Sequence, residues 1–137
     1  MAGGAVRYNR DWPMITLAKD LAVNLQEDRP GMLARAAEAI ASGGLNLDGF
    51  AEVEGILHML TADPRSARLA LEAAGLRLAA EQEVVVVVVE DRAGAAASVF
   101  GRLAGAGINV TYAYVASRNR LIIATDEPRR AMDVLGG

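Results

Sequence analysis

The sequence repeats itself once, and this repeat is the feature that most limits how the chain can fold. The segment 25–31 reads LQEDRPG, and the segment 88–94 reads VVEDRAG. At the same spacing, GLNL at 44–47 is matched by GINV at 107–110, and no gap is needed between the two matches. Two copies are too few for a solenoid, so the repeat predicts a duplicated small domain.

Each copy carries the same order of predicted elements. An apolar, β-prone run opens the copy, at 21–25 and again at 84–89. An amphipathic helix follows and ends at a glycine cluster, and then come an alternating strand, a tight turn and a short strand. Asp and Pro near 63–64 and 126–128 start a second helix, and 76–80 supplies a final strand in the first copy. The order predicts an α+β protein made of two ferredoxin-like βαββαβ units, each an antiparallel sheet with helices on one face.

The predicted organisation has three parts. Residues 1–19 form an N-terminal arm, 20–81 the first unit and 82–137 the second unit. The second unit has no residues left for its last strand. The apolar segment 14–18, MITLA, fills that edge in one interpretation, and the edge pairs with another chain in the other.

Composition narrows the possible partners. Net charge is −3 with no long basic run, which argues against nucleic acid as a partner. Cysteine is absent and His58 is the single histidine, so we expect no disulfide, no metal and no other cofactor. No apolar run approaches the roughly 20 residues of a membrane helix. We therefore expect a cytoplasmic protein without membrane contact.

The two copies resemble the ACT domain, a small-molecule regulatory module of amino-acid metabolism. The resemblance rests on EDRPGMLARAAEAIASGGLNL at 27–47 and EDRAGAAASVFGRLAGAGINV at 90–110. In both, a strand ends in Asp-Arg before a glycine, a helix follows, and Gly and Asn precede an amphipathic strand. The resemblance implies a tandem ACT protein that spans roughly residues 20–135 and binds a ligand at an interface between ACT units.

The resemblance also implies which residues touch the ligand. In serine-binding ACT domains, contacts come from polar side chains at the end of the first strand and from the Asn that opens the second strand. Val89 and Ala93 depart from the family pattern in the second copy, so the first copy fits better. The candidate ligand-binding set is Gln26, Asp28, Arg29, Pro30, Gly31, Met32, Leu33, Asn46, Asp91, Gly94 and Asn109.

The chemistry of these residues suits a free amino acid. Asp28 can accept hydrogen bonds from the ammonium group, and the N–H groups at the helix start near Gly31 can donate to the carboxylate. The amide of Asn46 can donate and accept. Structural roles stay open beside this hypothesis: Asp28 and Asp91 could cap the following helices, and the glycines could serve turn geometry alone.

The sequence therefore favours a non-enzymatic regulatory protein with a free amino acid as effector. We expect a homodimer whose partner is a biosynthetic enzyme or a regulator. The alternative is a ligand-free dimerisation or docking module that acts as a regulatory subunit, and Tyr112 and Tyr114 could line such an interface. Catalysis is disfavoured, because one histidine gives no Ser-His-Asp grouping and no loop resembles a phosphate cradle.

Overall fold

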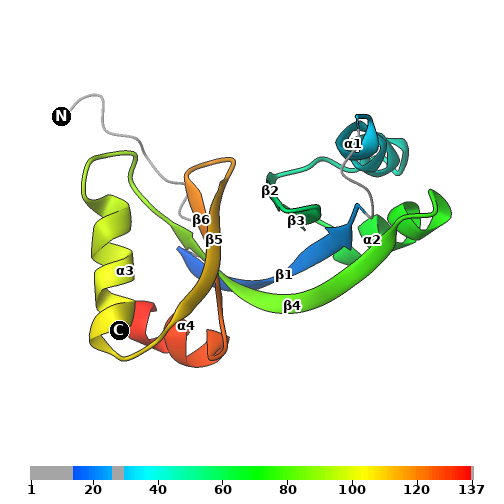
Figure 1. The fold of residues 1–137 in the computed structure, drawn as a ribbon. Coiled ribbons are helices and arrows are strands. Elements are labelled where there is room, and N and C mark those ends of the chain that lie inside the picture. Colours follow the sequence, from blue (N-terminus) through cyan, green and yellow to red (C-terminus); the bar gives the residue numbers. More distant parts are fainter. Residues whose placement is uncertain (1–13, 26–29, 137) are drawn as a thin grey trace, which may run out of the picture.

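A computed structural model describes residues 14–25 and 30–136 (Figure 1). The order strand, helix, strand, strand, helix occurs twice in it, as the repeat predicts, and the strand pairs are antiparallel. The predicted α+β class is confirmed. In chain order the elements are β1 Ile15–Asn24, α1 Met32–Ser42, β2 Gly49–Val53, β3 Ile56–Leu60, α2 Pro64–Ala73, β4 Arg77–Val88, α3 Ala95–Gly105, β5 Val110–Ala116, β6 Arg120–Thr125 and α4 Pro128–Gly136.

Strands β1 and β4 are the longest, and they pair with each other from end to end of β1. Ile15 lies opposite Val87 and Asn24 opposite Arg77, with one irregularity in register after Ala22. The C-terminal part of β1 also pairs with β3, and the C-terminal part of β4 pairs with β6. The two long strands thus run between the β2–β3 hairpin and the β5–β6 hairpin (Figure 1).

The segment 14–18, whose role the sequence leaves open, contributes to β1. Residues 15–18 pair with 84–87 of β4, on the edge opposite β6. The predicted strand 76–80 is likewise the beginning of β4. The boundaries predicted after residues 19 and 81 therefore fall inside continuous strands, and the division of the chain into two units remains a prediction.

The strands close into a barrel with the order β1-β3-β2-β5-β6-β4, where the sequence predicts two open sheets. Closure depends on a short contact between β2 and β5. Gly49 pairs with Ala116, and the N–H of Ser117 donates to the carbonyl of Asp48 at 2.7 Å. Gly49 permits this approach, because a Cβ there would lie only 2.6 Å from the Cβ of Ala116.

The four helices cover the outside of the barrel as two pairs, α1 with α2 and α3 with α4 (Figure 1). Alternation along each strand sends every second side chain outward to the helices and the others into the barrel. Three apolar clusters result. The largest buried members are Leu21, Ile40, Leu57, Met59 and Leu71 under α1 and α2; Val85, Leu103, Ile123 and Leu135 under α3 and α4; and Leu60, Val84, Val86, Tyr114 and Ile122 inside the barrel.

Helices α1 and α3 both begin after a glycine in the left-handed region, Gly31 with φ 95° and Gly94 with φ 87°. Within the described residues, no side-chain hydrogen bond caps α3, so the structure gives Asp91 no capping role. Helix α2 differs and starts as the sequence predicts. The carboxylate of Asp63 accepts hydrogen bonds from the hydroxyl of Ser66 at 2.7 Å and from the N–H of Ser66 at 3.1 Å, and these two bonds lower the pKa of Asp63.

We expect Gly94→Ala to destabilise the protein by about 1 kcal/mol, because an L-residue is strained at this positive φ. A thermal melt should show a decrease in Tm of roughly 3–6 °C. Gly101→Ala is the matched control, since Gly101 lies within α3 and a Cβ there meets nothing within 4 Å. That change should leave Tm unchanged or raise it, because Ala is the better helix former. Equal Tm values for Gly94→Ala and the unmodified protein would show that the left-handed turn is not required.

We expect Gly49→Ala to cost about 1–3 kcal/mol through overpacking against Ala116. The double change Gly49→Ala with Ala116→Gly should recover part of this loss, since it removes the Cβ–Cβ clash. A clash with the Cα of Ala116 at 2.9 Å remains, so recovery should be incomplete. Chemical denaturation of the three variants measures both effects, and two additive changes without recovery would contradict the close approach.

Candidate ligand-binding site

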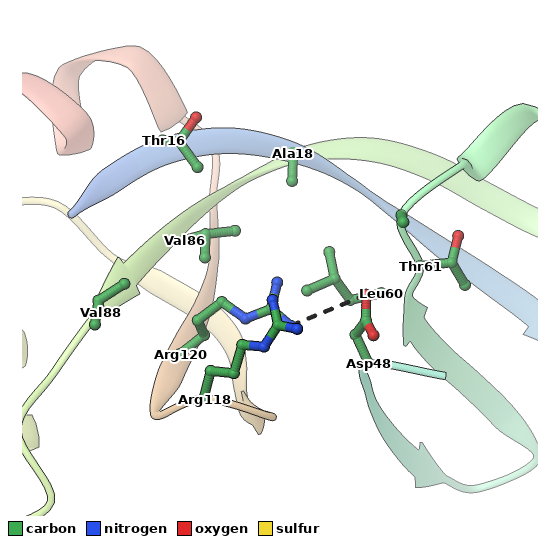
Figure 2. A pocket seen from close by; sticks show the side chains of 10 residues that line it. Thr16, Ala18, Asp48, Leu60, Thr61, Val86, Val88, Arg118 and Arg120 are labelled. Carbon is green, nitrogen blue, oxygen red and sulfur yellow. Dashed lines mark ion pairs between the residues drawn. The ribbon is translucent and has the colours of Figure 1, made fainter. Parts of the chain in front are cut away.

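A pocket of about 300 Å³ lies where the β5–β6 hairpin meets the segments that flank β2 and β3 (Figure 2). We call it the barrel pocket. Residues of β1 and β4 line one part of the pocket, and residues of the two hairpins and their flanking segments line the rest. Its lining residues are Thr16, Ala18, Asp48, Leu60, Thr61, Ala62, Val86, Val88, Arg118 and Arg120.

Two arginines and one carboxylate provide the charge of the barrel pocket. Figure 2 shows the side chains of Arg118 and Arg120 extending from the hairpin toward Asp48. Arg120 donates from Nε to the carbonyl of Ser117 at 2.9 Å and from Nη2 to its Oγ at 3.0 Å. The same Nη2 lies 3.9 Å from Oδ2 of Asp48. The guanidinium group of Arg120 is therefore held in place before any ligand arrives.

Arg118 occupies an unusual backbone position. It has φ 63°, and Asn119 after it has φ 56°, so two successive non-glycine residues are left-handed. Asn tolerates this region well, whereas Arg is strained there by roughly 1 kcal/mol. Strained backbone of this kind is concentrated at functional sites. The hairpin thus holds a long cationic side chain at the pocket at some cost in stability.

The rest of the barrel pocket is mostly apolar. Leu60, Val86 and Val88 are buried, and Ala18 adds a small apolar side chain beside them. Thr61 also lines the pocket, and its Oγ1 is the one buried side-chain polar atom that lacks a hydrogen-bond partner within residues 14–25 and 30–136. A mainly apolar pocket with a few placed polar groups is the usual composition of a small-molecule site.

A second polar cluster lies deeper in the barrel, around Asp20 of β1. This carboxylate is 1% exposed, and it accepts hydrogen bonds from Tyr114 Oη at 2.5 Å, Tyr112 Oη at 2.7 Å and His58 Nδ1 at 2.9 Å. The ring of His58 also packs on Tyr112, with centroids 4.1 Å apart. Three donors satisfy the buried charge, as stability requires. The cluster joins β1, β3 and β5, and thus both hairpins.

Burial raises the pKa of both Tyr112 and Tyr114 well above the ordinary value of 10, and the negative charge of Asp20 and its hydrogen bonds act in the same direction. The unfolded chain titrates near pH 10. The hydroxyls therefore stabilise the fold fully below pH 10, and this contribution is lost progressively as pH rises above it.

We expect these two tyrosines to stay un-ionised through pH 10 in the folded protein. The third tyrosine is Tyr8, so the variant Tyr8→Phe isolates the pair. Its near-ultraviolet absorbance should show no phenolate at pH 10 in buffer, and two phenolates that titrate near pH 10 in denaturant. Titration near pH 10 in the folded variant would contradict the buried cluster.

The structure describes some of the candidate residues of the first copy and places them in different surroundings. Gln26, Asp28 and Arg29 lie outside the described residues. Pro30 and Gly31 are exposed in the turn before α1, while Met32 is buried and packs in the core under α1 and α2. Leu33, another of the candidate ligand contacts, is 42% exposed near the start of α1.

Among the predicted residues that the structure describes, Asn46 is the one with a contact to a residue that lines the barrel pocket. Its Nδ2 donates to Oδ1 of Asp48 at 2.9 Å, so it holds the acidic side chain of the pocket. In the second copy, Asp91, Gly94 and Asn109 are exposed near the two ends of α3, and none of them lines the barrel pocket. Whether these residues bind a ligand remains a prediction.

Sequence reasoning missed Asp20, Asp48, Arg118 and Arg120. Signals were available for some of them. Asp20 follows Lys19 within a β-prone run that is mostly apolar, and the SRNR turn at 117–120 places two arginines at one hairpin end. The contacts of His58, Tyr112 and Tyr114 with Asp20 join residues that are far apart in the sequence, so no local motif indicates them.

The described residues offer little to a metal ion. No group of three or more His, Asp or Glu side chains is arranged to hold one in residues 14–25 and 30–136. Nor is any helix in this part of the chain both long and apolar enough to cross a membrane. The charged groups of the barrel pocket, two guanidinium groups and a carboxylate, are instead suited to a charged organic ligand.

Comparison with known proteins finds a match to the ACT domain over part of the chain. Residues 84–133 match the family model of the ACT domain. A solved structure of a protein from Bacteroides thetaiotaomicron has 27% sequence identity and a TM-score of 0.79, with 90% of each chain covered. No curated protein sequence matches the chain.

Aspartate kinase structures share the fold at lower identity. The ligand-free regulatory subunit of aspartate kinase from Thermus thermophilus is 18% identical, with a TM-score of 0.64 over 89% of this chain and 94% of that one. E. coli aspartokinase III in complex with aspartate and ADP is 15% identical, with a TM-score of 0.59 over 88% of this chain and 31% of that one. These matches establish an ACT-like α+β fold for the chain.

Proposed function

We propose that the chain is a non-catalytic regulatory protein of amino-acid metabolism that binds a free amino acid between two tandem ACT units. The barrel pocket is the observation that carries this proposal. Its walls come from both hairpins, and its volume of about 300 Å³ is at the small end of ligand sites. The predicted units, 20–81 and 82–137, would each contribute one side of the pocket.

The relatives support a regulatory role without a catalytic domain. The Thermus thermophilus protein is a regulatory subunit of aspartate kinase, and the match covers 94% of it. In that aspartate kinase, a chain of similar length is thus a separate regulatory subunit. By analogy, this chain would act on a biosynthetic enzyme supplied by another chain. That it does so as a homodimer is part of the proposal.

Binding between the hairpins also gives a means of regulation. An effector changes a protein only through different affinity for two of its states. A ligand that contacts Arg118 on one hairpin and Asp48 beside the other would favour the state in which these two side chains lie close together. Catalysis is not proposed, because the buried Asp20 already accepts hydrogen bonds from His58 and the two tyrosines, and the ring of His58 packs on Tyr112.

A thermal-shift measurement with each of the twenty amino acids tests the proposal. A ligand at about a hundredfold over its Kd should stabilise the folded state by roughly 2.7 kcal/mol and raise Tm by about 2–8 °C. We expect a selective shift with a small subset of the amino acids. Equal Tm values with all twenty would contradict amino-acid binding.

The second candidate function is a docking module that binds no ligand. Phe50 is 53% exposed and Val115 is 70% exposed. Phe50 follows Gly49 and Val115 precedes Ala116, the two residues that pair where the barrel closes. Two exposed apolar side chains at this junction favour contact with another protein. Failure of all twenty amino acids together with stable association of the chain would support this function.

A further inference from the structure

We propose that the barrel pocket binds an α-amino acid with a short aliphatic side chain, with the ligand carboxylate at Arg118 and Arg120 and the ligand ammonium at Asp48. This inference rests on the proposed function and adds the site, the orientation and the chemical class of the ligand. The binding site is then the barrel pocket, and not the turn before α1 where the sequence predicts most of the ligand contacts.

The charge of the barrel pocket selects an anionic group. Its two guanidinium groups outnumber Asp48, the one carboxylate among its lining residues. Like charges close together repel, and an anion placed between them removes this repulsion. Arg120 uses Nε and Nη2 for its contacts with Ser117, which leaves Nη1 as a further donor. Planar guanidinium groups match the two oxygens of a carboxylate, so an amino-acid carboxylate fits this end.

Asp48 is arranged to accept from the ligand ammonium. Its Oδ1 accepts from Asn46 at 2.9 Å, which fixes the orientation of the carboxylate. Its Oδ2 is 3.9 Å from Nη2 of Arg120, beyond the 2.7–3.2 Å range of an N–H···O hydrogen bond. Oδ2 therefore keeps its capacity to accept a hydrogen bond. Opposite charges thus stand on two sides of the pocket, as an α-amino acid requires.

The remaining walls define the side chain of the ligand. Ala18, Leu60 and Val86 are apolar, and no acid or base besides the three charged residues lines the pocket. A charged ligand side chain placed against these walls would lose its hydration without a partner. The volume of about 300 Å³ also favours a small ligand. Alanine, valine, leucine and isoleucine are the natural amino acids of this class.

The backbone at Arg118 provides a sharp variant. Asn tolerates the left-handed region, so Arg118→Asn relieves strain while it removes the guanidinium group. We expect this variant to be as stable as the unmodified protein or more so, and to bind the ligand 10- to 100-fold more weakly, roughly the effect of losing a charged hydrogen bond. Arg120→Lys and Asp48→Asn should also weaken binding by at least about tenfold. Arg92→Ala is the control, because Arg92 is an exposed arginine outside the pocket whose side chain pairs with Glu90.

Titration calorimetry with valine, valinamide and 3-methylbutanoate separates the two ends of the ligand. Valinamide lacks the carboxylate and should lose binding to Arg118 and Arg120. 3-Methylbutanoate lacks the ammonium, and its weaker binding should be insensitive to Asp48→Asn. The remaining aliphatic amino acids are measured beside valine, and aspartate and lysine represent charged side chains.

The outcomes distinguish this inference from the proposed function. Unchanged affinity in Arg118→Asn and Arg120→Lys, or tighter binding of aspartate or lysine than of any aliphatic amino acid, would overturn the inference and leave amino-acid binding intact. Binding of no amino acid would overturn the proposed function and this inference with it. Binding of 3-methylbutanoate alone, lost in Arg118→Asn, would show a carboxylate site and overturn the amino-acid class.

Discussion

The pairing of β1 with β4 is the constraint on which the rest of the structure depends. Because side chains alternate along a strand, one register decides which residues meet the helices and which enter the barrel. Ile15 and Leu17 pack in the outer core under α3 and α4, whereas Thr16 and Ala18 line the barrel pocket. A slip of one residue would exchange these faces and place Asp20 among the apolar side chains under the helices.

Asp20 makes that exchange costly. A buried carboxylate needs several donors, and the three that it has come from β3 and β5, on opposite hairpins. The charge is satisfied only when both hairpins are in place. We regard the cluster as a device that favours one assembly of the barrel over alternatives, a role for which buried polar groups are known in some other proteins. Removal of the Asp20 carboxylate would leave the hydroxyls of Tyr112 and Tyr114 without this acceptor.

The sequence predicts local structure well and long-range structure poorly. Asp63 and Pro64 start α2 as expected, and the predicted tight turn before the short strand lies at Glu54 and Gly55, both of which have positive φ. The gap-free repeat is misleading in the strands, however. It matches Leu21 with Val84, yet Leu21 packs under the helices and Val84 points into the barrel. Six consecutive valines carry no alternation, so nothing in that run shows which of them face the helices.

The difficulty of predicting long-range contacts also explains why the barrel pocket could not be predicted from the sequence. The helix starts and Asn46 follow from short motifs, and a resemblance can carry them over. The barrel pocket combines Thr16, Asp48, Val86 and Arg120, which only barrel closure brings together. That closure depends on Gly49 meeting Ala116, a contact between distant parts of the chain that no local propensity encodes.

Divergence between the two copies places both arginines of the barrel pocket on one hairpin. The β2–β3 turn consists of Glu54 and Gly55, whereas the β5–β6 turn carries Arg118 and is followed by Arg120. Had the copies stayed alike, both turns would present the same chemistry. Instead the arginines gather at one pocket, and the level of Asp20 is filled by His58 and the two tyrosines. A ligand bound in the barrel pocket would contact both hairpins, so its affinity would depend on their relative position.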